Sequence, residues 1–250
     1  MVYFYLVLGL MGAAIGSFLN VVIDRLPLKQ SLAFPPSHCP ACGQRLRAWD
    51  LVPVASYLGL GGRCRHCRAP IPRRILWVEL GTAAGFVLLL ARYGLSLELA
   101  VTCFYWSLLT VILVIALERR SLPGRVIYPA AVVILLINVL GRDPGLLNGL
   151  VGVGVGLLVM APLGLGRGSA GWGDVKMAGL VGLALGFPEG LVTLLIGVAA
   201  AGLVVGWRWL AGPKERGKVK VMGFVPFLAV ATAVMLLWGQ NITGWYLSLF

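Results

Sequence analysis

The sequence predicts an all-α polytopic membrane protein with about eight transmembrane helices and one cysteine-containing loop domain. The prediction depends on composition, on a series of long apolar segments and on one long polar segment. Of the 250 residues, 59% are hydrophobic and only 12% are charged, whereas a soluble domain carries about 25% charged residues. The mean hydropathy is +0.92. So few charged side chains could not cover the surface of a soluble protein, and that class is therefore excluded.

Eight apolar segments are candidate spanning helices, since a membrane crossing needs about 20 apolar residues. The first runs from Val2 to Ile23. It lacks a basic start and is too long for the apolar region of a cleaved signal peptide, so we expect a retained helix. Two later segments are short for a full crossing, and we expect either that both lie inside the bundle or that their true boundaries differ by a few residues. The seven later segments lie at about 75–92, 96–117, 126–140 (short), 145–165, 174–187 (short), 189–210 and 222–239.

A polar segment separates the first two helices and divides the chain into three parts. Residues 24–74 are rich in arginine, proline, glycine and cysteine, and no other polar segment is long enough to form an extramembrane domain. We therefore expect a first transmembrane helix at 1–23, a four-cysteine domain at 24–74 and a membrane core of about seven helices at 75–250.

The distribution of basic residues predicts the orientation in the membrane. If the N-terminus is outside, only Arg92 and Arg142 of the 21 lysine and arginine residues face that side. Because cytoplasmic loops carry an excess of lysine and arginine, we expect the four-cysteine domain in the cytoplasm. The net charge of +12 then reflects loops that face anionic lipid, and it calls for no nucleic-acid partner. The cytoplasmic segments in this orientation are 24–74, 118–125, 166–176 and 207–220.

Two CxxC pairs in the polar segment predict a zinc site. Cys39-Pro-Ala-Cys42 and Cys64-Arg-His-Cys67 together offer four thiolates, the number that a tetrahedral structural zinc requires. Two redox dithiols, or simply free thiols, are the alternatives, although a cytoplasmic placement argues against stable disulfides. We therefore expect residues 24–74 to form a cytoplasmic zinc-binding loop domain. Its metal is expected to be structural, since a catalytic zinc keeps an open coordination position.

Four other reactive or charged residues receive ordinary structural interpretations. His38 and His66 adjoin the cysteines, but four sulfurs already fill the coordination shell, so we expect both histidines outside it. Cys103 lies within an apolar segment and is expected to be a buried core residue. Glu79 follows two arginines at positions 73 and 74, and we expect it to cap a helix or to pair with one of them.

Charged residues within membrane-spanning segments are costly and usually functional, and two places carry them. Asp174 lies between Gly171 and Lys176 at the start of the sixth apolar segment, where Gly171 and Gly173 permit close backbone approach. Taken alone, Asp174 could equally be a helix N-cap. Glu118 and two arginines follow the third apolar segment, and taken alone they form an ordinary interfacial charge cluster.

Together, the motifs of this chain resemble those of a known family. In order, they are Gly16-Ser-Phe-Leu-Asn-Val-Val-Ile-Asp-Arg-Leu-Pro27, the four-cysteine loop with Pro53 to Tyr57, Ile71-Pro-Arg-Arg with Glu79-Leu80, the GxGDxK run Gly171 to Lys176, and Phe224-Val-Pro-Phe-Leu228. In this order and topology they resemble the prepilin peptidases, also called type IV leader peptidases, which are membrane aspartic proteases. The resemblance covers nearly the whole chain, and it implies that Asp174 is the second of two catalytic aspartates.

One departure from the family pattern concerns the first catalytic aspartate. The family has an aspartate in a segment that reads I-D-L-E-x-x-x-L-P, whereas this chain reads Ile115-Ala116-Leu117-Glu118 before Leu-Pro. Ala116 therefore occupies the position of the first catalytic aspartate. It is either an engineered inactivating change or the mark of a natural pseudo-enzyme. Glu118 is two residues further on, about 200° around a helix, so we expect no rescue by its carboxylate.

An aspartic protease needs two carboxyl groups that share one proton around a water molecule. One takes a proton from the attacking water, and the other donates toward the carbonyl oxygen of the substrate. Like charges held close together cannot both ionise, which is what keeps the shared proton in place. With Asp174 alone, we predict that the chain binds its substrate but cleaves it extremely slowly.

The resemblance also implies the substrate, a second activity and the setting. The substrate would be the basic leader of type IV pilin precursors or of type II secretion pseudopilins, at the cytoplasmic face of the bacterial inner membrane. Many members also methylate the new N-terminus with S-adenosylmethionine, although no methyl-donor motif is recognisable here.

Two other classes of function are the alternatives. A transporter would place its polar groups near the midplane, whereas here they lie at one edge. A membrane assembly factor with a zinc-stabilised docking loop would suit a natural alanine at position 116.

Overall fold

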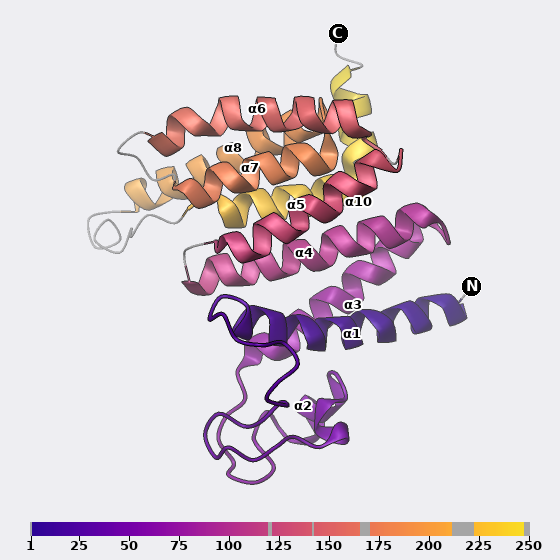
Figure 1. The fold of residues 1–250 in the computed structure, drawn as a ribbon, viewed down its shortest axis with the longest axis vertical. Helices are drawn as coiled ribbons and strands as arrows, with labels where there is room; N and C mark the ends of the chain where they lie inside the picture. Colours follow the sequence, from indigo (N-terminus) through magenta and orange to yellow (C-terminus); the bar gives the residue numbers. More distant parts are fainter. Residues whose placement is uncertain (1, 120–121, 142, 166–170, 212–222, 248–250) are drawn as a thin grey trace. The chain divides into compact units, whose positions relative to one another are not determined.

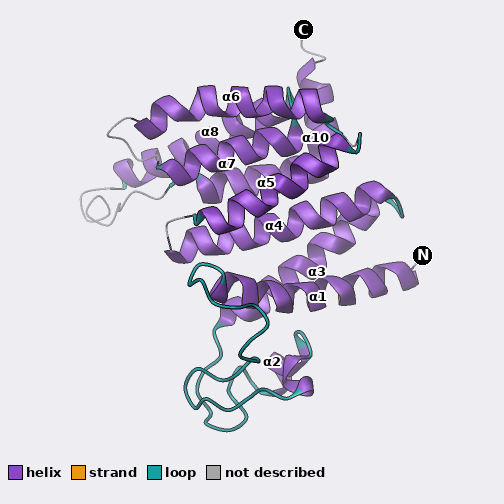
Figure 2. Ribbon diagram, in the orientation of Figure 1, coloured by secondary structure: helices purple, strands orange, loops and turns teal. Residues whose placement is uncertain are grey.

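The computed structural model describes all residues except 1, 120–121, 142, 166–170, 212–222 and 248–250 (Figure 1). Throughout the described residues the regular elements are helices, joined by loops (Figure 2). The chain forms two compact units, Met1–Val111 and Ile112–Phe250.

The first unit is built on two closely packed helices, α1 (Val2–Arg25) and α3 (Arg73–Tyr93). Glycine makes the close packing possible, because a Cβ atom on Gly16 would lie only 2.8 Å from the Cα of Glu79. A third helix, α4 (Leu97–Arg119), begins in this unit. Its Trp106 donates an indole hydrogen bond of 3.1 Å to the Gly81 carbonyl of α3.

The segment between α1 and α3 contains the loop domain. Its helices are short, a 3-10 turn η1 (Ala48–Leu51) and the helix α2 (Ala55–Gly59), which contact each other. Two isolated β-bridges, His38 with Arg45 and Arg63 with Pro70, each close a tight loop. Each loop holds one of the CxxC pairs, so the loop domain consists of two similar knuckles separated by η1 and α2.

The second unit is organised around α7, whose Met177 and Ala178 are completely buried. Helix α7 packs against α5, α6, α8 and α10. The contact with α6 depends on glycine, since a Cβ atom on Gly152 or on Gly182 would overlap the backbone of the other residue. The helices of this unit are α5 (Gly124–Val139), α6 (Leu146–Leu165), α7 (Trp172–Leu185), α8 (Glu189–Leu210) and α10 (Val225–Leu247).

The predicted fold class is confirmed: this is an all-α polytopic membrane protein. Each of the eight apolar segments corresponds to one long helix among the described residues. Four are long and apolar enough to cross a membrane, over Val2–Arg25, Arg73–Tyr93, Leu97–Arg119 and Glu189–Trp207. Three shorter apolar helices are Gly124–Val139, Leu146–Pro162 and Val225–Gly239. One boundary matters for the site: α7 begins at Trp172, two residues before the predicted start.

Candidate functional site

The four cysteines of the loop domain converge on one point. The sulfur atoms of Cys39, Cys42, Cys64 and Cys67 all lie within 4.8 Å of one another. Cys39 Sγ and Cys67 Sγ are 3.8 Å apart, which is about the separation of two sulfurs bound to a tetrahedral zinc at about 2.3 Å. All four are free cysteines. The donor set and its spacing therefore fit one structural zinc ion and do not form two separate disulfides.

The two knuckles have the same hydrogen-bonded turn. The N–H of Gly43 donates to the Cys39 carbonyl at 2.8 Å, and the N–H of Arg68 donates to the Cys64 carbonyl at 3.1 Å. Both closing residues have a positive φ, +71° at Gly43 and +60° at Arg68. Glycine adopts this conformation readily, whereas arginine does so at a cost. The second turn is thus the more strained of the two.

The pKa values of two thiols in the cluster, Cys39 and Cys67, are shifted in opposite directions. Backbone hydrogen bonds from Cys42 and Ala41 lower the pKa of Cys39 to about 6. At Cys67 a backbone hydrogen bond from Ala69 acts in the same direction, but burial and the neighbouring thiols raise the pKa to about 11. Since a metal binds thiolates, loading the site would release a proton from Cys67.

His38, which precedes Cys39, lies outside the cluster. His38 Nδ1 lies 3.0 Å from the carbonyl oxygen of Pro36, and within the described residues the metal-binding group consists of the four cysteines. The predicted burial of Cys103 is also confirmed, with 7% of the residue exposed.

An ion pair between Arg65 and the well-covered carboxylate of Asp50 connects the second knuckle to η1. Arg65, from the second CxxC pair, forms an ion pair of 2.8 Å with Asp50, and the Asp50 side chain is only 4% exposed. Asp50 also accepts the backbone N–H of Arg47 at 3.2 Å. Burial alone would raise the pKa of Asp50, but the hydrogen bonds from Arg65 and Arg47 outweigh it and lower the pKa below its ordinary value.

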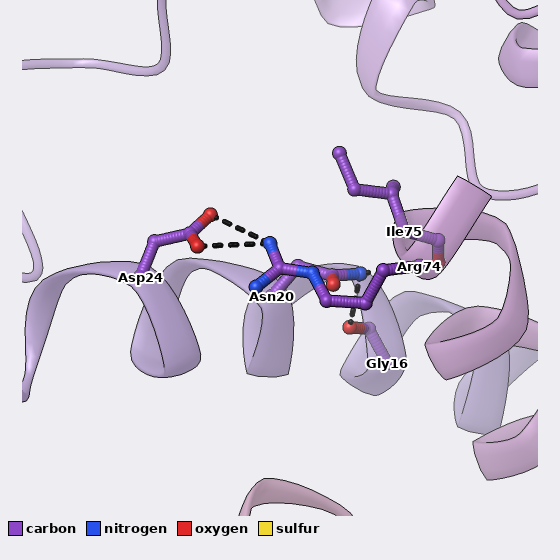
Figure 3. A network of polar contacts seen from close by, with 5 residues as sticks. All are labelled: Gly16, Asn20, Asp24, Arg74 and Ile75. Atoms are coloured by element: carbon purple, nitrogen blue, oxygen red, sulfur yellow. Dashed lines mark hydrogen bonds and ion pairs between the residues drawn. The ribbon is translucent and has the colours of Figure 1, made fainter. Parts of the chain in front are cut away.

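Polar residues also connect α1 to α3 (Figure 3). Arg74 donates from one nitrogen to both carboxylate oxygens of Asp24, at 2.8 and 2.9 Å. Buried Asn20 donates to the carbonyl oxygens of Gly16 and Ile75, each at 3.2 Å. The start of α3 is therefore tied to the last turns of α1.

The expectation for Glu79 was wrong, because its carboxylate reaches the loop domain instead of the arginines. Glu79 is 4% exposed and accepts the backbone N–H of Val54 at 2.7 Å. Val54 has a φ of +62°, an unfavourable conformation for a β-branched residue. This hydrogen bond helps to hold Val54 in that conformation and attaches the loop domain to α3.

The carboxylate of Asp174 is buried and is held on both sides by backbone N–H groups. The residue is 3% exposed. One oxygen, Oδ2, accepts the N–H of Gly171 at 2.7 Å, and the other, Oδ1, accepts the N–H of Val225 at 2.8 Å. The second donor belongs to the start of α10, and a Cβ atom on Gly223 would lie 3.1 Å from Oδ1. Residues 223–225 therefore close tightly over this carboxylate.

Asp174 is not the N-cap residue of α7, which was one alternative for it. Gly171 is the cap residue of α7, and Asp174 is the third residue of the first turn. A carboxylate in the first turn is stabilised by the positive end of the helix dipole. Asp174 thus has a structural role at the helix start, and this role leaves its side chain beside α10.

Ala116 and Glu118 point in different directions from α4, as predicted. Ala116 is 8% exposed and follows the completely buried Ile115, whereas Glu118 is exposed. Leu122 lies at the start of α7, because a Cβ atom on Gly173 would lie 3.5 Å from the Cβ of Leu122. Position 116 lies six residues before that contact.

Lys176, the last residue of the GxGDxK run, is directed to α5. Its Nζ atom lies 5.2 Å from the centre of the Tyr128 ring, within range of a cation–π interaction. Nothing in the sequence indicates that Lys176 would contact Tyr128. The same is true of the hydrogen bonds from Val225 to Asp174 and from Val54 to Glu79, although residues 224–228 were recognised as a motif.

Comparison with known proteins assigns the chain to a family. Residues 10–93 match the bacterial peptidase A24 N-terminal domain, and residues 103–207 match the type IV leader peptidase family. The chain is 33% identical to a prepilin leader peptidase/N-methyltransferase of Pseudomonas putida, over 96% of this chain and 92% of the relative. It is 34% identical to the protein of that name from Aeromonas hydrophila, over 99% and 95% of the two chains.

A third relative of the same name, from Burkholderia pseudomallei strain K96243, is 32% identical over 96% of this chain and 86% of the relative. No solved structure matches the chain. Two matching domains in the expected order, and relatives similar over nearly their whole length, lead to one conclusion: this chain belongs to the prepilin leader peptidase/N-methyltransferase family.

Proposed function

We propose that this chain is a membrane aspartic endopeptidase for prepilins and pseudopilins that has lost one of its two catalytic carboxyl groups. The observation that carries the proposal is Asp174, a buried carboxylate held by two backbone N–H groups at the start of α7. Ala116 stands at the position of the other carboxyl group, the first of the two catalytic aspartates in the family pattern. As written, the chain binds a prepilin and cleaves it extremely slowly.

The chemistry of the pair explains why one carboxylate is insufficient. Cleavage needs a base that takes a proton from water and an acid that donates one toward the scissile carbonyl. Asp174 supplies one carboxylate, and its two N–H partners fix the orientation of that group. Alanine at position 116 can neither share a proton with it nor polarise the carbonyl, so water is left without a second catalytic group.

The substrate follows from the family and from the position of the site at the membrane boundary. A prepilin has a short basic leader followed by a long apolar helix. The apolar helix lies in the membrane beside the bundle, which leaves the scissile bond at the membrane boundary. The proposed setting is the bacterial inner membrane, with the N-terminus outside and both Asp174 and the four-cysteine domain on the cytoplasmic side, as the distribution of basic residues predicts.

Two cofactors belong to the proposal. Cys39, Cys42, Cys64 and Cys67 would hold zinc, which would stabilise the loop domain without taking part in cleavage. S-adenosylmethionine would supply the methyl group for the N-terminus released by cleavage, an activity named in the relatives.

The test is cleavage of a prepilin peptide in detergent by this chain, by Ala116→Asp and by Ala116→Asn. We expect cleavage by the aspartate variant alone, since asparagine has a similar size but cannot exchange a proton. Binding of the peptide should be similar in all three. If Ala116→Asp is inert toward a panel of prepilins with metal and lipid supplied, the peptidase proposal is refuted.

A second candidate function rests on the same alanine. If Ala116 is natural, the chain could act as a non-catalytic assembly factor that holds prepilins through an intact framework. Failure of the aspartate variant to cleave, together with retained prepilin binding by the original chain, would favour this function.

A further inference from the structure

In the loop domain, four of the exposed apolar side chains lie close together in the sequence, within residues 48–59. Trp49 is 61% exposed, Leu51 43%, Val52 47% and Leu58 64%. Single exposed apolar residues are ordinary on a protein surface, but a group that includes tryptophan indicates an interaction site. The segment comprises η1, α2 and their connection, and we call it the 48–59 segment.

The loop domain itself does not cover these side chains. Tyr57 faces inward, since a Cβ atom on Gly62 would lie 3.0 Å from its ring and hydroxyl group. Asp50 is likewise taken up by its ion pair with Arg65. The 48–59 segment thus contacts the second knuckle through Asp50 and lies against Gly62 through Tyr57, and it leaves Trp49 and Leu58 exposed.

The hydrogen bond from Val54 to Glu79 fixes the position of the segment along the axis of α3. Glu79 lies six residues beyond Arg73, the first residue of α3, which is about 9 Å along a helix. Arg73 and Arg74 are the residues expected at the lipid headgroups. A contact with Glu79 therefore places Val54 no further from the bilayer than the headgroup layer.

The charges around the segment suit an anionic lipid surface. Asp50 is the only acidic residue between 48 and 59, and it is already paired. Arg47 precedes η1 and is exposed, and Arg65 beside it keeps 47% of its side chain exposed. Tryptophan and aliphatic side chains next to arginine are the composition of interfacial membrane anchors.

We propose that the 48–59 segment lies in the headgroup layer of the membrane that the helices cross, with Trp49, Leu51, Val52 and Leu58 inserted and the arginines toward anionic lipid. The four-cysteine domain then rests on the bilayer instead of projecting from it. A prepilin leader is a poorer occupant, because a basic leader would meet the basic surroundings of Arg47 and Arg65. The inference does not require the chain to be a peptidase.

The experiment measures quenching of Trp49 by brominated lipid in nanodiscs that contain the full chain. Because the chain has 8 tryptophans, the contribution of Trp49 is the difference between the original chain and Trp49→Phe. Nanodiscs of phosphatidylcholine alone are compared with nanodiscs containing phosphatidylglycerol, and Arg47→Gln is measured in both. Equal metal content of all variants shows that the loop domain is folded.

We expect Trp49 to be quenched in anionic nanodiscs and less quenched in neutral ones. Each arginine near an anionic surface shifts a membrane-binding equilibrium about fivefold, so Arg47→Gln should reduce the difference between the two lipids. Absence of Trp49 quenching in anionic nanodiscs would overturn the proposal. Equal quenching in the two lipids would also overturn it. Shielding of Trp49 that appears only after a prepilin peptide is added would overturn it in favour of a substrate-binding surface.

Discussion

The backbone N–H of Val225 can be removed without removing the residue's apolar contact, which allows a sharp test of the Asp174 site. Val225 is the first residue of α10, a position where proline is well tolerated because the N–H makes no bond within the helix. Here that N–H donates to Asp174 Oδ1 at 2.8 Å. Val225→Pro therefore deletes the Val225 donor, and Val225→Ala keeps the donor while shortening the side chain.

The expected magnitude follows from the type of hydrogen bond. A hydrogen bond to a charged group contributes about 1.5 to 3 kcal/mol, and about 1.4 kcal/mol in a barrier changes a rate tenfold. In the Ala116→Asp background, Val225→Pro should thus lower kcat by about tenfold to a hundredfold. KM should change little, since the lost bond orients the carboxylate and does not touch the substrate.

The assay is steady-state cleavage of a prepilin peptide by Ala116→Asp alone and combined with either substitution at Val225. Val225→Ala serves as the control for lost packing, because residue 225 is 6% exposed. Thermal unfolding in detergent shows whether each variant is folded. If the proline and alanine variants have the same kcat, the N–H of Val225 has no part in positioning Asp174 and the reasoning fails.

Three further predictions concern the loop domain and the packing of α1 on α3. Gly16→Leu should lower the unfolding temperature in detergent, because its side chain would meet the α3 backbone 2.8 Å from the Cβ position, whereas Gly81→Ala, with nothing within 4 Å, should not. Cys64→Ser should abolish stoichiometric zinc binding, measured by elemental analysis, and expose the loop domain to protease, while Cys103→Ser should change neither. Asp50 has a lowered pKa in the folded chain, so its ion pair stabilises the loop domain above the unfolded pKa of about 4 and loses this effect as the pH falls through the folded value. The protection factors of the loop-domain amides, which correct exchange for its intrinsic rate at each pH, should therefore fall on acidification in the original chain and depend less on pH in Asp50→Asn.

The sequence was most informative where the chemistry is local. Two cysteines three positions apart can reach one ion whatever the rest of the fold does, so the spacing of Cys39 with Cys42 and of Cys64 with Cys67 predicted the cluster that the structure contains. The apolar segments likewise predicted the helices, since hydropathy is summed over about 20 residues. Helix ends were less exact, as the early start of α7 shows.

Contacts between distant residues were not predictable in the same way. The expected partner of Glu79 was a neighbouring arginine, yet its carboxylate accepts the N–H of Val54, 25 positions earlier. Asp174 accepts an N–H from Val225, 51 positions later. Every residue except proline carries such a donor, so no side chain in the sequence marks the one that a carboxylate will use.

The geometry of Asp174 also explains why an alanine at position 116 leaves the framework intact. The hydrogen bonds to Asp174 at 2.7 and 2.8 Å come from the backbone at Gly171 and Val225, and neither involves α4. Alanine is the best helix former, and replacing a buried carboxyl group removes a desolvation cost. The fold around Asp174 therefore does not depend on a second carboxylate, whereas the proposed cleavage does. Under the proposed function, binding of substrate and its cleavage become separable at this one position, and we predict that the chain holds an uncut prepilin.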